Sequence, residues 1–144
     1  MGIKNRLTIL NFLQFFVWGS WLISLGGYMI VTLKFTGGQV GSIYATMGIA
    51  SLFMPGLMGI VADRWVNAER VYGALHIIGG VLLLWASTIT DPTMFYWVML
   101  FNSMAYMPTI ALSNTVAYSV LERHGFNAVS YTHLIWPVNR SQCP

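Results

Sequence analysis

The stretch GIVADRWVNAER, residues 59–70, decides how this chain folds, because it is a charged island between two long apolar segments. It holds Asp63, Arg64, Glu69 and Arg70, whereas the whole chain of 144 residues has only seven Lys and Arg and four Asp and Glu. Charges gathered at one place in so apolar a chain mark a boundary with water. The segments on either side are therefore expected to lie in an apolar medium.

The composition indicates that this medium is lipid. Hydrophobic residues make up 56% of the chain and charged residues 8%, against about 25% charged in an average soluble domain. A small soluble domain exposes much surface that polar groups must cover, so a packed core cannot explain the deficit. The net charge of +3 is spread out, which argues against nucleic-acid binding.

The sequence also argues against an enzyme. It has no phosphate-binding Gly loop, no Ser/His/Asp arrangement and no cluster of metal-ligand residues. The one cysteine, Cys143, allows no disulfide within the chain and no zinc-ligand spacing. We therefore expect no catalytic residues, no cofactor and no metal.

Four charge-free segments follow one another, each about as long as the roughly 20 apolar residues that cross a membrane, or longer. We expect helices at residues 9–33, 41–62, 71–90 and 94–120. Turn signals at residues 36–38 and 91–92 leave short connections, so neighbouring helices run antiparallel. The sequence predicts an all-α membrane protein with four transmembrane helices.

The distribution of Lys and Arg predicts the orientation. One set of loops holds only Lys34, and the other holds Lys4, Arg6, Arg64, Arg70 and Arg123. Short loops rich in Lys and Arg stay in the cytoplasm. We expect a multi-pass protein whose amino terminus and charged island are cytoplasmic.

The island resembles the loop signature of the major facilitator superfamily. The resemblance rests on Gly59-x-x-x-Asp63-Arg64 followed by Arg70. In that superfamily the signature lies on the cytoplasmic side between the second and third helices, as expected here. The match is incomplete, because residues 65–67 replace a Gly and further basic residues of the usual pattern.

Longer blocks are similar to the bacterial nucleoside:proton symporters of that superfamily. They are FLQFFVWGSWL (12–22), GGYMIVTLKF (26–35), FMPGLMGIVAD (53–63) and NSMAYMPT (102–109). The resemblance implies that residues 1–129 are a partial amino-terminal bundle of a major facilitator fold. Residues 130–144 diverge from the family, and we expect a tail of unrelated or artefactual sequence there.

The resemblance implies nucleoside transport by proton symport in a bacterial inner membrane. The implied partners are a nucleoside, protons, the lipid bilayer and the missing carboxy-terminal helices of the same fold. The four helices alone are expected to be inactive. Two alternatives stay open: a facilitator for another small polar solute such as a sugar, and a small non-transporting membrane partner protein.

Two helices carry candidate groups for a substrate cavity. The predicted helix 9–33 places Gln14, Trp18 and Trp21 on one stripe, and the helix 94–120 does the same for Asn102, Tyr106 and Thr109. A polar amide facing lipid is costly, so Gln14 should face protein or a water-filled cavity. The hydrogen-bonding groups of the second helix suit a sugar-and-base ligand. Tryptophans could stack on a flat ring. Ordinary interhelical packing and hydrogen bonding is the alternative.

The resemblance implies that Gly59, Asp63, Arg64 and Arg70 form a cytoplasmic gate motif. The alternative is that these charges lie at the interface and set only the topology. His76 is, besides tyrosines, the one titratable side chain inside a predicted span, so it could relay protons or bond a neighbour. No Asp or Glu lies inside a predicted span, so the principal proton-coupling groups are expected in a part of the fold beyond this chain.

Overall fold

The computed structural model describes residues 2–123, except for the side chains of Lys4 and Asp63. The described part is helical, as the sequence predicts. Its elements are α1 (Ile3–Gly27), the π-helical turn η1 (Tyr28–Thr32), α2 (Gly37–Arg64), α3 (Ala68–Ala86) and α4 (Pro92–Arg123). The expected tail, residues 130–144, lies outside the described residues.

The helix ends differ from the predicted bounds because polar side chains set them. Helix α2 begins at Gly37 rather than at residue 41, because Thr36 and Gln39 form a capping box, in which the Thr36 N–H donates to Gln39 Oε1 over 2.8 Å. Helix α1 begins at Ile3 rather than at residue 9. Its polar first turns continue the helix beyond the apolar segment.

The third helix ends at Ala86, four residues before the predicted end. The hydroxyls of Ser87 and Thr88 donate to the carbonyls of Leu84 and Trp85 over 2.7 and 2.8 Å. These bonds satisfy carbonyls that the end of a helix leaves without partners. Helix α4 then begins at Pro92, and Asp91 Oδ2 accepts the Met94 N–H over 2.8 Å.

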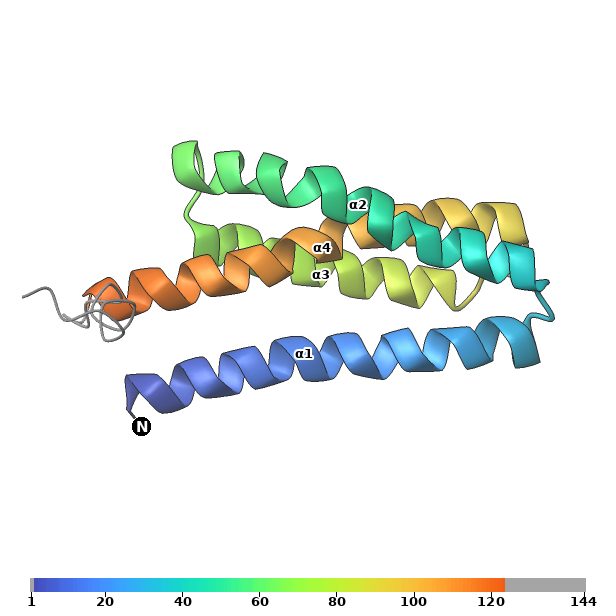
Figure 1. Ribbon diagram of the computed structural model, residues 1–144, viewed down its shortest axis with the longest axis horizontal. Coiled ribbons are helices and arrows are strands. Elements are labelled where there is room, and N and C mark those ends of the chain that lie inside the picture. Colours follow the sequence, from blue (N-terminus) through green and yellow to red (C-terminus); the bar gives the residue numbers. More distant parts are fainter. Residues whose placement is uncertain (1, 124–144) are drawn as a thin grey trace, which may run out of the picture.

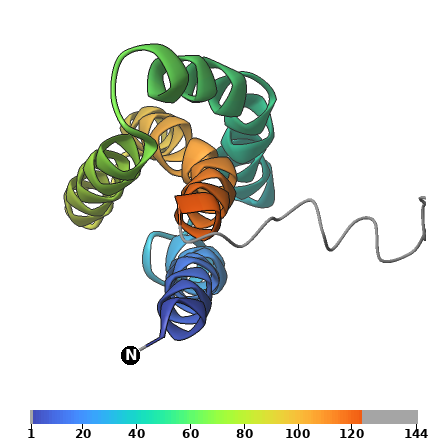
Figure 2. The same cartoon turned by 90° about the vertical axis from the view of Figure 1, so that its left-hand side faces the viewer.

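The helices run alternately up and down along one long axis (Figure 1). The amino terminus, the connection between α2 and α3 and the end of α4 lie at one end, which we call the amino-terminal end of the bundle; the other is the opposite end. Seen along the bundle, α4 lies between α1 on one side and the α2 and α3 helices on the other (Figure 2). The other three helices therefore all lie against α4.

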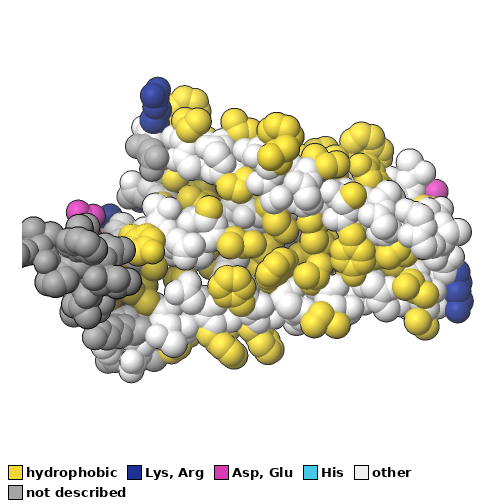
Figure 3. Space-filling model, viewed as in Figure 1, with side chains coloured by type: hydrophobic (Ala, Val, Ile, Leu, Met, Phe, Trp, Pro, Cys, Tyr) yellow, Lys and Arg dark blue, Asp and Glu magenta, His cyan; other side chains and the backbone are white. Residues whose placement is uncertain are grey.

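The surface matches a chain surrounded by lipid. Hydrophobic side chains cover the length of the bundle, and charged ones appear near its ends (Figure 3). Helices α1 with η1, α2 and α3 are each long and apolar enough to cross a membrane. Helix α4 has the length but is not among them. Four of the six buried polar side chains in the described residues belong to it: Asn102, Ser103, Thr109 and Ser113.

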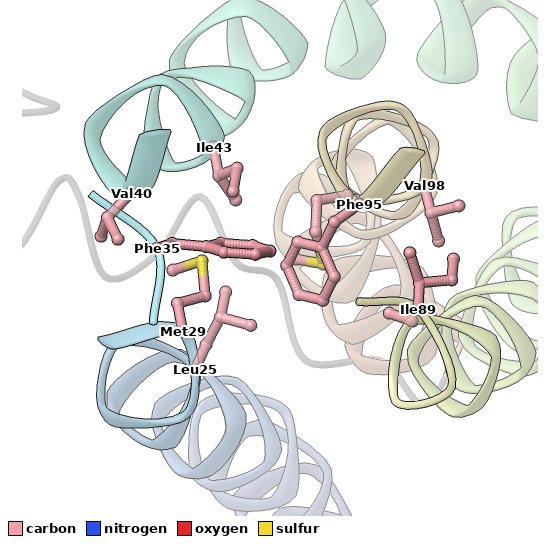
Figure 4. Packing of buried hydrophobic residues seen from close by; sticks show 10 residues of the cluster. Leu25, Met29, Phe35, Val40, Ile43, Ile89, Phe95 and Val98 are labelled. Carbon is pink, nitrogen blue, oxygen red and sulfur yellow. The ribbon is translucent and has the colours of Figure 1, made fainter. Parts of the chain in front are cut away.

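An apolar cluster joins α1, α2, α3 and α4 at the opposite end of the bundle. Met29 and Phe95 are almost fully buried in it. Figure 4 shows Phe35 against Phe95, with ring centroids 5.6 Å apart and planes at 81°, the edge-to-face geometry that aromatic pairs favour. The cluster fixes the end of α1 that leads into η1.

A glycine brings α1 and α2 close together beside this cluster. The Tyr44 hydroxyl donates to the Leu22 carbonyl of α1 over 3.0 Å. A Cβ atom on Gly26 would lie 2.8 Å from that hydroxyl, whereas one on Gly27 would meet nothing within 4 Å. A helical side chain leans toward the preceding turn, so the glycine uncovers the carbonyl four residues before it.

Candidate functional site

The centre of the bundle is organised around the amide of Gln14. This side chain is 2% exposed. Its Nε2 group donates to Thr109 Oγ1 over 2.9 Å and to Tyr106 Oη over 3.2 Å. Its Oε1 atom accepts from the Tyr72 hydroxyl over 2.8 Å. One glutamine of α1 thus binds both α3 and α4.

The partners of Gln14 on α4 also bond to main-chain carbonyls. The Tyr106 hydroxyl donates to the carbonyl of Gln14 over 2.9 Å, and the Thr109 hydroxyl donates to the carbonyl of Tyr106 over 2.6 Å. Each donor therefore has an acceptor in a region where water cannot supply one. We call Gln14, Tyr72, Tyr106 and Thr109 the glutamine network.

Aromatic rings surround the Tyr106 side of this network. Trp21 of α1 meets Tyr106 edge to face, with centroids 5.8 Å apart. His76 of α3 lies 5.8 Å from the same ring and 4.4 Å from the ring of Tyr72. The His76 Nδ1 atom is 3.0 Å from the Tyr72 carbonyl, one turn earlier on its own helix. His76 therefore contacts the glutamine network through the rings of Tyr72 and Tyr106.

Three side chains near the network carry buried polar atoms without a hydrogen-bond partner in the described chain. They are the indole N–H groups of Trp18 and Trp21 and both ends of the Asn102 amide. Asn102 is fully buried. These groups can still form hydrogen bonds to a partner outside the described chain.

Comparison with known proteins identifies the family. Residues 1–133 match the family described as "Nucleoside H+ symporter". The chain belongs to this family. It is 54% identical over 130 residues to xanthosine permease and 50% identical over 130 residues to nucleoside permease NupG, both of Escherichia coli (strain K12). These matches cover 90% of the chain but 31% of each relative.

Solved structures agree with this assignment to the nucleoside H+ symporter family. A crystal structure of nucleoside transporter NupG superimposes with a TM-score of 0.83 at 50% identity, covering 90% of this chain and 32% of that one. A crystal structure of a NupG mutant gives a TM-score of 0.84. The chain therefore has the fold of part of a major facilitator transporter and spans about a third of the length of its family relatives.

The structure of this family member brings most of the predicted cavity residues together. Gln14, Tyr106 and Thr109 bond directly to one another, and Trp21 packs on Tyr106. Trp18 and Trp21 both pack against the apolar cluster that contains Tyr106. Asn102 is fully buried beside Gly79 of α3. Sequence analysis missed Tyr72. Its position four residues before His76, on one face of a helix, was the available signal.

The predicted gate motif lies at the amino-terminal end of the bundle. Gly59 and Asp63 are in the last turns of α2, Arg64 ends that helix, and Arg70 follows in the first turn of α3. Both arginines are exposed, and the side chain of Asp63 is outside those described. Next to Arg70, Glu69 forms an exposed ion pair of 3.4 Å with Arg123 of α4, which sequence analysis did not predict.

Replacing Gln14 by leucine tests whether the network holds α1. Tyr106 and Thr109 would keep their main-chain acceptors, but the Tyr72 hydroxyl would lose the acceptor that the structure shows. We expect Gln14→Leu to lower the unfolding free energy of the purified chain in micelles by about 2 kcal/mol. Phe12→Leu, on the exposed side of α1, is the matched control. Equal stability of both variants and the unaltered chain would contradict a holding role.

Proposed function

We propose that the complete protein to which this segment belongs moves nucleosides across a bacterial inner membrane by proton symport. Family membership, with 50–54% identity to two permeases over 90% of the chain, is the observation that carries the proposal. The buried polar face of α1 and α4 supports it. Major facilitator transporters bind substrate between two six-helix halves, and this segment supplies part of one half.

We assign three roles to the six candidate side chains. Trp18 and Trp21 contact the nucleoside, because their indole N–H groups lack a partner in the described chain and their rings can stack on a base. Gln14, Tyr106 and Thr109 hold those tryptophans in place, because their own hydrogen bonds are already made. Asn102 is fully buried against α3, one turn before Tyr106, and does not contact the substrate but supports the position of Tyr106.

Proton coupling depends chiefly on residues beyond the described chain. In residues 2–123, Asp and Glu lie at helix ends rather than inside a span. His76 is the secondary candidate for proton transfer. When its Nδ1–H donates to the Tyr72 carbonyl, the Nε2 atom remains to accept a proton. Asp63, Arg64 and Arg70 are proposed to form a gate on the cytoplasmic side, next to Gly59.

A chimera tests the transport proposal. Residues 1–129 replace the corresponding part of the Escherichia coli xanthosine permease, in cells without nucleoside permeases. We expect saturable xanthosine uptake that a protonophore abolishes. Trp18→Phe and Trp21→Phe keep an aromatic ring but remove the N–H, so each should raise KM by about tenfold if the lost bond contributes about 1.4 kcal/mol. The exposed Trp97 of α4 supplies the control variant Trp97→Phe.

The chimera result separates the proposed roles from their alternatives. A chimera that reaches the membrane but takes up a sugar, or nothing, would contradict nucleoside transport. Normal KM in both tryptophan variants would remove Trp18 and Trp21 from the substrate site. The chain of 144 residues alone is expected to insert without transporting, because alternating access needs two opposed bundles.

The proposed orientation has its own test. Basic residues gather at the amino-terminal end of the bundle, as the sequence predicts, and such loops stay cytoplasmic. We expect Asn67→Cys in a Cys143→Ser background to be protected from an impermeant thiol reagent added to sealed cells. A cysteine in place of Thr36, at the opposite end, is the control and should react. Labelling at position 67 with protection at position 36 would show that the orientation is the reverse of the one proposed.

A further inference from the structure

The contact between Gly26 and Tyr44 shows how this bundle makes a hydrogen bond to a helix main chain. Gly26 leaves the Leu22 carbonyl uncovered, and the Tyr44 hydroxyl occupies the space where a Cβ atom would stand. The acceptor is four residues before the glycine. The donor comes from a neighbouring helix. A glycine notch and a polar side chain together form an interhelical joint.

The same two components face each other between α3 and α4. Gly79 is buried on α3, and a Cβ atom there would lie 3.5 Å from Asn102 Oδ1 of α4. The carbonyl four residues before Gly79 belongs to Leu75. Asn102 is fully buried, and neither end of its amide has a partner in the described chain. Here the polar group lies beside the notch, but it makes no hydrogen bond to the Leu75 carbonyl.

We propose that Gly79 and Asn102 form a two-position joint, in which the Asn102 amide donates to the Leu75 carbonyl in a conformation of the transport cycle other than the one seen here. This inference rests on the proposed transport function. Rotation about the last side-chain torsion of Asn102, which is broad for an amide, exchanges Oδ1 and Nδ2 at the notch. A small shift of α3 along α4 then brings the N–H to the carbonyl.

The surroundings allow such a shift. Toward the amino-terminal end, Val71, Leu75, Ala105 and Leu112 form an apolar part of the contact between α3 and α4. Beside it, His76 meets the Tyr106 ring, and the Tyr72 hydroxyl bonds to Gln14 of α1. Apolar contacts are non-directional, so they tolerate a small displacement. The Glu69–Arg123 pair at the end of this contact is exposed, and exposed ion pairs hold geometry weakly.

The joint is placed to act on the candidate substrate groups. Tyr106 follows Asn102 by one turn of α4, bonds to Gln14 and packs on Trp21. Helices α3 and α4 lie side by side in both views (Figures 1 and 2), and His76 meets Tyr106 one turn before Gly79. A shift of α3 along α4 at Asn102 would therefore displace Tyr106 and, through it, the Trp21 ring.

The test uses the complete chimera, with uptake and thermal unfolding measured on the same variants. Asn102→Leu removes the donor, and Gly79→Ala covers the notch at an ordinary contact distance. Both should leave the midpoint of unfolding unchanged or higher, because the bond is absent in this conformation and Ala is the better helix former. Both should lower Vmax by about tenfold with little change in KM, and the double variant should be no slower than either single one.

Two glycines provide matched controls. A Cβ atom on Gly80 would meet nothing within 4 Å, so Gly80→Ala should preserve both Vmax and the unfolding midpoint. Gly26→Ala blocks a notch that is already occupied, so it should lower the midpoint. Normal Vmax in Asn102→Leu and Gly79→Ala would overturn the joint. A lower midpoint in Asn102→Leu would also overturn it, because the amide would then be bonded in this conformation.

A second measurement does not depend on transport. Relaxation dispersion of the Asn102 side-chain NH₂ signals, identified by their loss in Asn102→Leu, detects exchange between two conformations. We expect exchange in the unaltered chimera and its loss in Gly79→Ala. A chimera without uptake would refute the proposed function, whereas an Asn102 signal without exchange would refute the joint.

Discussion

The amide of Gln14 lies among apolar helices, where water cannot satisfy it, and the middle of the bundle is arranged to supply its partners. Tyr72 provides the donor to its oxygen, and Tyr106 and Thr109 provide the acceptors for its nitrogen. The side chains around Gln14 on α1, such as Phe12, Leu13 and Phe15, are exposed and apolar. Polar contacts at one residue therefore set where α1 lies in its first half.

Two kinds of interaction hold α1 against the rest of the molecule. At the opposite end, packing holds α1 in place: Met29 and Phe35 lie in the apolar cluster, and the space beside Gly26 holds the Tyr44 hydroxyl. In the middle of the bundle, directed hydrogen bonds hold α1 in place. Lipid tails are as apolar as these side chains, so the hydrophobic effect does little between helices in a membrane. Packing at one end and the glutamine network at the centre do that work instead.

The sequence predicted the helices because their positions follow from the cost of polar groups in lipid. Lys34, Asp63 and Asp91 lie at the ends of helices or in the connections between them. The same cost predicted that Gln14 faces protein or a water-filled cavity, and the structure bonds it to Tyr106 and Thr109. Whether the six candidate side chains contact substrate stays a prediction.

Other features needed coordinates. The capping box of Thr36 and the hydroxyl bonds of Ser87 and Thr88 move helix ends by a few residues, which a count of charges cannot detect. The sequence did not single out Tyr72, whose hydroxyl bonds to Gln14 in the structure. The unpaired amide of Asn102 beside Gly79 depends on how α3 and α4 are aligned, and residue spacing on one helix does not show that.

A double-mutant cycle between Gln14→Leu and Tyr72→Phe tests most directly whether the glutamine network holds α1. Unfolding free energies of the purified chain in micelles give the coupling energy of the pair. The account predicts a coupling of about 0.5–2 kcal/mol, because Tyr72→Phe removes the hydroxyl that Gln14→Leu leaves unpaired. The pair Gln14→Leu and Tyr44→Phe should couple by nearly zero, because Tyr44 of α2 bonds to a different part of α1, at Leu22. Equal coupling in both cycles would contradict the account.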